Sequence, residues 1–340
     1  MWEKSMISGI SVVICTHNGA KRIGPVLSHI LVQEICPFEW EVIIVDNAST
    51  DDLVSAVSAV WTASIPLQII NEPTIGVGYA RQTGIKASKF KYICFVDDDN
   101  YLQNNYLRTL FEFMESHPDA GVVGGLNDPP VNTEFKDWFE RYQAMYAIGP
   151  QAQEAGKLEN PFAAIWGAGM GVRKEAWQKV LDDGFVLLMR SRTGDQLLSG
   201  EDNEICYLLR LYGYALYYEP NLRLVHQIPD HKLTWNYCRR MKKGFGATSV
   251  VLSLYRMLLA QKFLGKPLSN RSWLIELLSS LWKIVAHPVD FLATVLNLFE
   301  GNFRILQMQA CIGSFHYRLK LLWRLDQTRE VLYNRYQHLL

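Results

Sequence analysis

Between Ile10 and Gly125, short apolar runs rich in Val and Ile alternate with longer segments whose apolar residues recur at helical spacing. Parallel strands need crossover connections, so this rhythm predicts a mostly parallel sheet covered by helices. The predicted strands are residues 10–15, 41–46, 67–71 and 92–97. The predicted helices are residues 22–34, a segment that Asp51 or Asp52 caps and that continues toward Trp61, residues 76–87 and residues 104–116.

The pattern weakens from Pro129 to Asn160. The next run, residues 162–173, predicts a buried strand interrupted by glycines, which lets a ligand or another backbone approach closely. A helix that ends near Gly213 and two short strands joined by a turn at Pro220 and Asn221 complete this region: residues 200–213, 215–220 and 222–227.

After about Trp235 the chain changes to basic and apolar helical stretches, so we expect a helical extension over residues 236–340 behind an α/β part over residues 1–235. Its Trp, Leu and Phe residues beside Arg and Lys are compatible with amphipathic helices on an anionic membrane surface. A helical cap on the α/β part or a homodimer interface buries such a face equally well. No run of about eighteen uncharged apolar residues occurs, so no conventional membrane-spanning helix is expected.

The composition narrows the classes of partner. The 340 residues include 34 basic residues (Lys and Arg) and 34 acidic residues (Asp and Glu), so the two charges balance. A general nucleic-acid-binding protein needs an excess or a stripe of basic residues. We therefore expect no nucleic-acid partner. The six cysteines form no CxxC pair, and the first residues lack the pattern of a secretory signal. These features favour a cytoplasmic protein, either free or peripheral on the cytoplasmic face of the membrane.

An apolar strand ends abruptly in three consecutive aspartates, Asp97, Asp98 and Asp99. Adjacent carboxylates repel one another, and a cation or hydrogen-bond donors must compensate where water is scarce. Hard oxygen ligands at the end of a parallel strand suit Mg²⁺ or Mn²⁺, which bridge carboxylates to substrate phosphates. The alternative is a solvated turn whose acids cap the next helix. The ends of the first two predicted strands meet the triplet at one sheet edge, where open α/β sheets bind ligands.

Taken together, six segments in order resemble glycosyltransferase family 2, whose members have a GT-A fold with a nucleotide-binding half followed by an acceptor half. The segments are SVVICTHNGA, EVIIVDNASTDD, NEPTIGVGYARQTGI, YICFVDDDN, WGAGMGVRKEAW and GEDNEICYLLRLYGY. The resemblance implies an α/β fold of GT-A type, with a mostly parallel central sheet flanked by helices and a Rossmann-like nucleotide-binding half. That half would span about residues 1–125, and the acceptor half about residues 126–235.

The resemblance implies a role for several residues of the first half. Thr16 matches the loop that contacts base and ribose, and Asn18 lies in the same loop. Asp46 matches a carboxylate that accepts from the imide N–H of uracil. Arg81 matches a position that reaches the base or the diphosphate, for which a planar guanidinium is well shaped. A helix-capping carboxylate and a surface arginine are the respective alternatives for Asp46 and Arg81.

The resemblance also divides the acid triplet. Asp97 would lie near the ribose, Asp98 is the variable middle residue of the nucleotide-sugar site, and Asp99 would bind Mn²⁺ or Mg²⁺. His226 occupies a position where some members place a further metal ligand, although a lone His at a strand end is often structural. The cation would stabilise the negative charge of the departing nucleoside diphosphate.

In the second half, Asp202 of the Glu201–Asp202 pair matches the base that takes the proton of the acceptor hydroxyl, with Glu201 beside it. Both acids could instead complement a helix dipole. Trp166, Gly167 and Gly169 would form a loop under the donor sugar or the acceptor, with packing as the alternative for the Trp.

The sequence therefore predicts an inverting glycosyltransferase that passes a sugar from a nucleotide-sugar, with a lean toward UDP, to a hydroxyl of a glycan, a lipid-linked sugar or another acceptor. Polysaccharide or glycan biosynthesis is the expected setting. Two alternatives stay open: a catalytically silent nucleotide-sugar-binding protein, and a metal-dependent nucleotidyltransferase.

Overall fold

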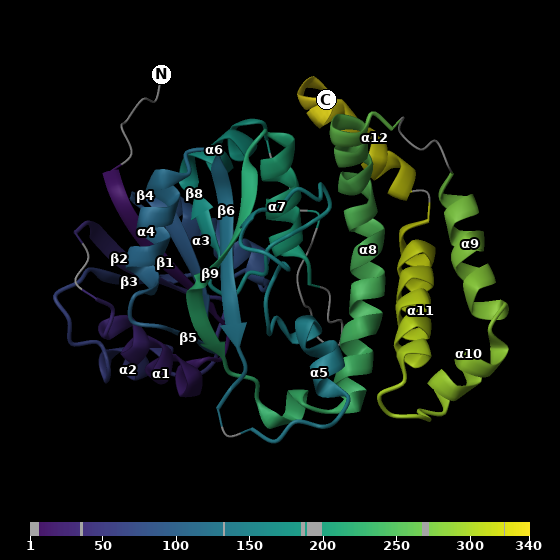
Figure 1. The fold of residues 1–340 in the computed structure, drawn as a ribbon, viewed down its shortest axis with the longest axis horizontal. Helices are drawn as coiled ribbons and strands as arrows, with labels where there is room; N and C mark the ends of the chain where they lie inside the picture. The colour runs from purple at the N-terminus through teal and green to yellow at the C-terminus, as the bar shows by residue number, and fades with distance from the viewer. Residues whose placement is uncertain are drawn as a thin grey trace.

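The computed structural model describes residues 7–34, 37–131, 133–184, 188, 199–266, 272–322 and 324–340. Within them the centre is a nine-stranded sheet of order β3-β2-β1-β4-β8-β6-β9-β5, with β7 paired to β9. The sheet and its helices form one part of the molecule, and the C-terminal helices stand beside it (Figure 1).

The first half confirms the predicted α/β alternation. The parallel strands are β1 (Ile7–Thr16), β2 (Glu39–Asp46), β3 (Leu67–Asn71) and β4 (Phe90–Asp97). The helices between them are α1 (Ala20–Leu31), α2 (Leu53–Ser58) and α3 (Val77–Ala87). Asp52 caps α2 by accepting a hydrogen bond from the Ser55 amide at 3.0 Å. Helix α2 ends at Ser58, before the predicted Trp61.

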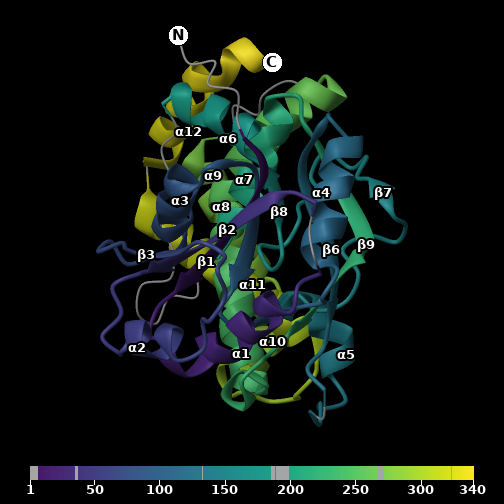
Figure 2. The same cartoon turned by 90° about the vertical axis from the view of Figure 1, so that its left-hand side faces the viewer.

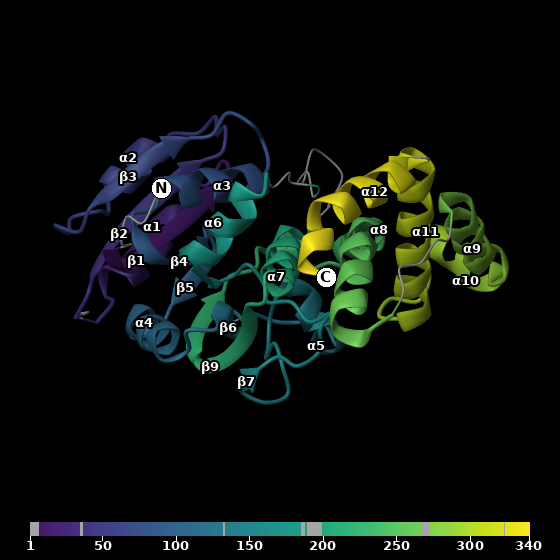
Figure 3. The same ribbon diagram turned by 90° about the horizontal axis from the view of Figure 1, so that it is seen from above.

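Alternate side chains of each strand point to opposite faces of the sheet, and each face has its own core. Val13 and Ile43 pack in the cluster that includes α3, α6 and α7, whereas Val12 and Val42 pack in the cluster that includes α1 and α4. Figures 2 and 3 show α3 and α4 on opposite sides of the sheet. Near-continuous Val and Ile in β1 and β2 therefore follows from burial on both faces.

The second half is more irregular than predicted. Its elements are β5 (Asn100–Leu102), α4 (Tyr106–Ser116), β6 (Ala120–Asp128), α5 (Phe139–Tyr142), β7 (Gly156–Lys157), β8 (Gly171–Arg173), α6 (Lys174–Asp182), α7 (Glu201–Leu211) and β9 (Ala215–His226). Strands β5 and β6 and helix α6 were not among the predicted elements. The 3-10 turn Gln143–Tyr146 follows α5.

The two strands predicted over residues 215–227 are one strand, so that prediction was wrong. Both parts of β9 pair in parallel with β6, and the register shifts between Gly124 and Leu126. Pro220 and Asn221 therefore lie in a bulge of one strand instead of a turn between two. A Cβ on Gly125 would lie 1.7 Å from the Leu222 carbonyl oxygen, so a glycine is required where the strands meet at this bulge.

The prediction of a strand over residues 162–173 was wrong for most of this segment, because only Gly171–Arg173 is a strand of the sheet. The preceding amides donate to side chains instead of to a strand: Ile165 N to Cys206 Sγ, Trp166 N to Gln151 Oε1 and Gly167 N to Asp202 Oδ2. The glycine-rich segment is thus a loop held by distant side chains.

The C-terminal helices are α8 (Trp235–Leu264), α9 (Trp273–Val285), α10 (Pro288–Val295), α11 (Phe303–Leu321) and α12 (Arg324–Tyr336), with a 3-10 turn at Gln337–Leu339. Helix α8 packs against α7, and α11 and then α9 follow it away from the sheet (Figure 3). Helices α8 and α11 touch through backbone, because a Cβ on Gly246 would lie 2.0 Å from the Ala310 carbonyl oxygen. Among the described residues, no helix has both the length and the apolar character needed to cross a membrane.

Candidate active site

The carboxyl ends of β1, β2 and β4 meet at one edge of the sheet. In the parallel register Thr16 lies beside Asp46 on β2, and Cys15 lies beside Asp97 on β4. Neighbouring strands are about 4.8 Å apart, so the predicted nucleotide residues of three strands form a single row. The Cys15 thiol lies in this row, and burial raises its pKa to about 12.

The first loop is fixed to the loop after β2. Asn18 adopts a left-handed backbone (φ 50°), and its Oδ1 accepts from the Thr50 amide at 2.7 Å. Asp46 Oδ1 accepts from the Ser49 amide at 3.0 Å. Both side chains therefore shape the loops, and Asn18 makes its contacts at an exposed position.

Asn47 was not predicted as a site residue, although it follows Asp46 directly. Its buried amide donates to the carbonyl oxygens of Glu72 and Thr74 at 3.1 and 2.7 Å and accepts from the Gly76 amide at 2.7 Å. It thereby anchors the segment that leads into α3. A polar residue immediately after a buried strand was the available sequence signal.

Asp98 points back toward α1. Arg22 donates to it with Nε at 3.1 Å and Nη2 at 2.7 Å, and the Thr16 hydroxyl donates to Oδ2 at 2.5 Å. This fork-shaped pair raises the pKa of Arg22. The Asp98 carboxylate and the Thr16 hydroxyl therefore form hydrogen bonds with each other, and Asp98 also with Arg22. Sequence reasoning did not select Arg22, which lies in the first turn of the helix after the loop.

Arg81 is buried at the centre of the site instead of lying on a helix surface. Its Nη2 is 3.7 Å from Asp97 Oδ1, and the guanidinium lies 5.4 Å from the centroid of the Phe95 ring. Burial disfavours the cation, but the charges of Asp97 and Asp202 raise the pKa of Arg81 above its ordinary value. The same arginine thus faces acids from both halves of the sequence.

Asp202 lies in the first turn of α7 and is held from two sides. Its Oδ2 accepts from the Gly167 amide at 3.1 Å, and its Oδ1 accepts from the Asn203 amide at 2.8 Å and from the Asn203 side chain at 3.0 Å. Gly167 also lies against Arg81, since a Cβ there would be 2.1 Å from Nη2. The structure therefore brings Asp97, Arg81, Gly167 and Asp202 together.

Glu201 points inward beside this group. It is 4% exposed, and its Oε2 accepts from the Gly200 amide at 3.0 Å. Its Oε1 is buried and has no hydrogen-bond partner within the described residues. A small cavity is lined by Glu201, Arg81 and Trp177. The charge of Glu201 is among those that raise the pKa of Arg81.

Asp99 and His226 are adjacent where β5 pairs with β9. His226 Nε2 is 3.4 Å from Asp99 Oδ1, and Lys232 Nζ is 3.9 Å from Asp99 Oδ2. Burial raises the pKa of Asp99, but His226, Lys232 and Arg22 outweigh it and lower that pKa overall. Burial lowers the pKa of His226, but the carboxylate of Asp99 outweighs it and raises that pKa. No sequence signal pointed to Lys232.

The predicted sugar loop lies against the same centre. Trp166 is half-buried, with its amide donating to Gln151 Oε1 at 2.7 Å. Gly169 has a left-handed backbone (φ 71°), and its carbonyl accepts from the Tyr106 hydroxyl at 2.6 Å. The loop is therefore fixed by partners from three other segments.

Comparison with known proteins identifies the family. The family model described as Glycosyl transferase family 2 matches residues 11–181. The chain belongs to this family. The predicted enzyme class, a glycosyltransferase, is thereby confirmed.

Two curated relatives agree with this assignment. The glycosyltransferase is 20% identical over 243 residues to Glucosyl-dolichyl phosphate glucuronosyltransferase of Haloferax volcanii, covering 69% of this chain and 75% of that protein. It is 28% identical over 109 residues to Poly(ribitol-phosphate) beta-N-acetylglucosaminyltransferase TarS of Staphylococcus aureus, covering 32% of this chain and 19% of that protein.

Solved structures confirm the GT-A fold. Mannosyltransferase PcManGT from Pyrobaculum calidifontis, in complex with GDP-Man and Mn²⁺, matches with a TM-score of 0.58 at 16% identity, covering 94% of this chain and 88% of that chain. S. aureus TarS 1-349 in complex with UDP matches with a TM-score of 0.51 at 16% identity, covering 95% and 91%. At these identities the likeness is one of fold.

Proposed function

We propose that this glycosyltransferase moves a sugar from a nucleoside-diphosphate sugar to an acceptor hydroxyl by a single displacement that inverts the anomeric carbon. The observation that supports it is the group of Asp97, Arg81, Gly167 and Asp202, which joins the strand-end acids to the first turn of α7. Acids from the two halves that lie close together suit in-line transfer from a bound donor to a bound acceptor, which needs both held in one orientation.

The donor would lie along the row formed by Thr16, Asp46 and Asp97. Asp46 Oδ1 is occupied by the Ser49 amide, whereas Oδ2 makes no hydrogen bond to the described residues and is available for an imide N–H. This favours a uridine nucleotide. The structural neighbours bind UDP in one case and GDP-Man in the other, so the lean toward uridine depends on Asp46.

Asp99 and His226 would hold a divalent cation, Mn²⁺ or Mg²⁺. A carboxylate oxygen and an imidazole nitrogen 3.4 Å apart, Asp99 Oδ1 and His226 Nε2, can share one ion. No group of three His, Cys, Asp or Glu side chains around one point occurs in the described residues. Two protein ligands fit an ion whose other positions are filled by diphosphate oxygens and water. When bound, the cation would offset the charge of the leaving diphosphate.

Asp202 would take the proton of the acceptor hydroxyl. The Gly167 amide and Asn203 hold its two oxygens, so the carboxylate has a fixed orientation before the acceptor binds. Glu201 is too deeply buried to reach an acceptor. We therefore assign the base to Asp202 and regard Glu201 as part of the charge balance around Arg81. The Trp166 loop would contact the sugar or the acceptor, a glycan or lipid-linked hydroxyl.

The test is sugar transfer by an Asp202→Asn variant with Mn²⁺ and a panel of nucleotide-sugars, measured as release of nucleoside diphosphate. Loss of a general base lowers turnover by about 10²–10⁴-fold. Nucleotide affinity should stay within about two-fold of wild type, because Asp202 lies outside the row of Thr16, Asp46 and Asp97. Glu175→Gln is the matched control, since Glu175 is an exposed acid in the first turn of α6. Wild-type turnover in the Asp202→Asn protein would contradict the assignment.

A further inference from the structure

Helix α9 is oriented with its polar side toward the protein. Glu276 on its inner side pairs with Arg318 at 3.5 Å and with Arg329 at 3.1 Å, and Ser280 is buried. Leu277 is buried on the inner side as well, but six other apolar residues lie on the opposite side at spacings of three, four and seven, which is one face of a helix. They are exposed by 38–70%: Leu274, Ile275, Leu278, Leu281, Trp282 and Val285. A helix surrounded by water has the opposite arrangement.

The apolar surface continues over α10 and the turn that follows it. Most of the large apolar side chains exposed in the described chain belong to this α9–α10 face, which we define as the six residues of α9 above together with Val289, Phe291, Leu292, Val295, Leu296, Leu298, Phe299 and Phe303. The face lies on the side of the molecule farthest from the sheet (Figures 1 and 3). Exposed apolar surface of this extent marks an interaction site.

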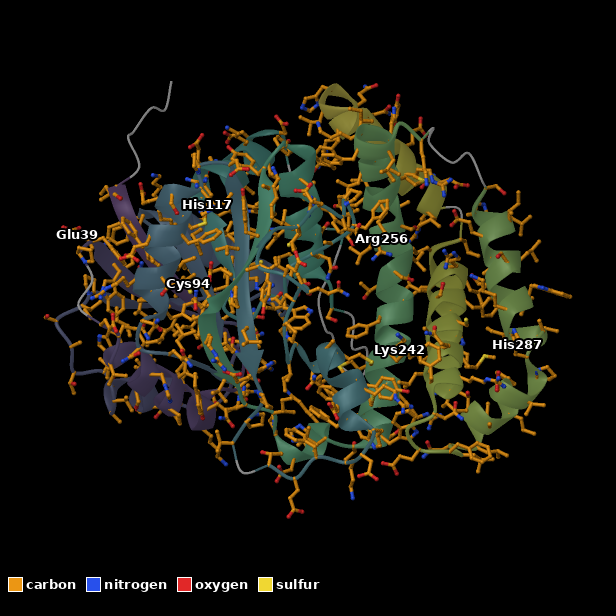
Figure 4. The ribbon with its side chains drawn as sticks, in the orientation of Figure 1. Glu39, Cys94, His117, Lys242, Arg256 and His287 are labelled. Atoms are coloured by element: carbon orange, nitrogen blue, oxygen red, sulfur yellow. The ribbon has the colours of Figure 1, made fainter. Side chains whose placement is uncertain are left out.

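A basic groove of about 690 Å³ runs along the edge of this face, between α8, α9 and α11. Its cations are Lys242, Lys283 and Arg318, and its single acid, Glu276, is already paired with two arginines. Five serine hydroxyls also line it; those of Ser249, Ser253 and Ser280 donate to carbonyl oxygens of their own helices, which leaves those of Ser279 and Ser314 for a bound anion. Figure 4 labels Lys242 on α8 and His287 at the turn between α9 and α10. Cations and hydroxyl groups together suit a phosphate.

Ile275 belongs to both surfaces, since it is 54% exposed on the apolar face and also lines the groove. Phosphate-binding groups beside an apolar surface match the layering of a phospholipid monolayer, in which the phosphates lie just outside the acyl chains. We propose that the α9–α10 face inserts into the boundary of an anionic lipid bilayer while the groove holds a lipid phosphate.

A second copy of the chain is less suited to this surface. In a twofold contact only residues near the axis meet their own copies, so a homodimer would cover the apolar face but offer no acid to the lysines at its edge. An anionic bilayer complements both the cations and the apolar residues. The inference does not depend on the proposed sugar transfer, because vesicle binding needs neither donor nor acceptor.

Flotation of the full chain with vesicles tests the proposal. Vesicles of phosphatidylcholine containing about 30% phosphatidylglycerol should bind the protein, and pure phosphatidylcholine should bind it more weakly. The double variant Lys242→Gln, Lys283→Gln should bind the anionic vesicles roughly 30-fold more weakly, at about a factor of five for each lysine. Lys243→Gln, which removes an exposed charge outside the groove, should bind as wild type.

The apolar face has its own pair of variants. Trp282→Ser should reduce binding to both kinds of vesicle, whereas Val331→Ser, which changes an exposed apolar residue on α12, should leave it unchanged. Equal binding to both vesicles overturns the proposed preference for an anionic bilayer, since both lipids carry a phosphate. Full binding by the double lysine variant overturns the phosphate assignment. A wild-type protein that ignores vesicles overturns the whole proposal. If that protein also forms a dimer that Trp282→Ser dissociates, the face belongs to a second copy.

Discussion

Replacement of Arg81 by methionine would remove the buried cation that faces both Asp97 and Asp202. Methionine preserves the length and flexibility of the side chain, so the change is mainly one of charge. At 3.7 Å and an effective dielectric constant of about 20, the attraction between Arg81 and Asp97 is roughly 4 kcal/mol. Loss of one partner of a fully buried pair costs about 3–5 kcal/mol.

The expected loss is smaller than this because Asp97 is not fully buried. The side chain of Asp97 is 34% exposed, so water would solvate much of the unpaired charge. We expect Arg81→Met to lower the free energy of unfolding by about 2 kcal/mol. With a urea dependence of about 3 kcal/mol per molar, the unfolding midpoint should fall by about 0.7 M. Arg81→Lys keeps the charge and should recover part of the difference.

Activity should fall further than stability in the same variant. Arg81 lies against Gly167, and the Gly167 amide holds Asp202, so loss of the guanidinium would release the proposed base from its position. A displacement of about 1 Å at a reacting group costs about 100-fold in rate. Lys86→Met, an exposed change on the same helix, is the control. If Arg81→Met has the midpoint and the transfer rate of Lys86→Met, Arg81 does not join the two halves and the reasoning fails.

Three further outcomes are expected. Gly167→Ala, whose Cβ would lie 2.1 Å from Arg81 Nη2, should destabilise the fold by about 1–3 kcal/mol and reduce transfer; unchanged urea unfolding would refute the contact. Lys91 and Tyr92 donate hydrogen bonds to Glu115, and these bonds, that of Lys91 foremost, lower the pKa of Glu115. Wild type should therefore be more stable than Glu115→Gln above the ordinary carboxyl range, and this difference should be lost as the pH falls from about 5 to about 3, measured by thermal unfolding. Chelation with EDTA should abolish transfer, and added Mn²⁺ should restore it; EDTA-resistant transfer would exclude a metal at Asp99.

The first half of the fold was predictable because its strands are buried on both faces. Burial of this kind leaves near-continuous Val and Ile in β1 and β2, with polar residues where the strands end, and both signals are local in sequence. The cap at Asp52 is equally local, because its partner Ser55 is three residues away. Such features follow from residue type and spacing alone.

The second half was less predictable because distant partners decide its structure. Strand β6 contains Gly121, Gly124 and Gly125, which weaken a strand signal but are needed where Tyr214, Ile165 and Leu222 approach. The loop before β8 reads as a strand from its apolar residues, yet its amides bond to side chains of other segments. No local pattern contains this information.

The candidate site shows the same division. Its acids could be selected from strand ends and a helix start, but the burial of Arg81 could not, since one of the residues that covers it, Gly167, lies 86 positions later. The family resemblance indicated that Arg81 belongs to the site. Only the packing of α3 against the glycine-rich loop places it between acids from both halves.

Helix α8 connects the candidate site with the surface proposed to bind lipid. On one side it contacts the helix of the proposed base, where the Tyr255 hydroxyl donates to Glu204 at 2.5 Å and the Thr248 hydroxyl donates to the Ser199 carbonyl at 2.8 Å. On another side it contributes Lys242 to the basic groove. Residues of one continuous helix therefore contact both places, so a protein docked by its α9–α10 face would hold Asp202 at a fixed position relative to the bilayer. This arrangement suits an acceptor that is itself carried by a lipid.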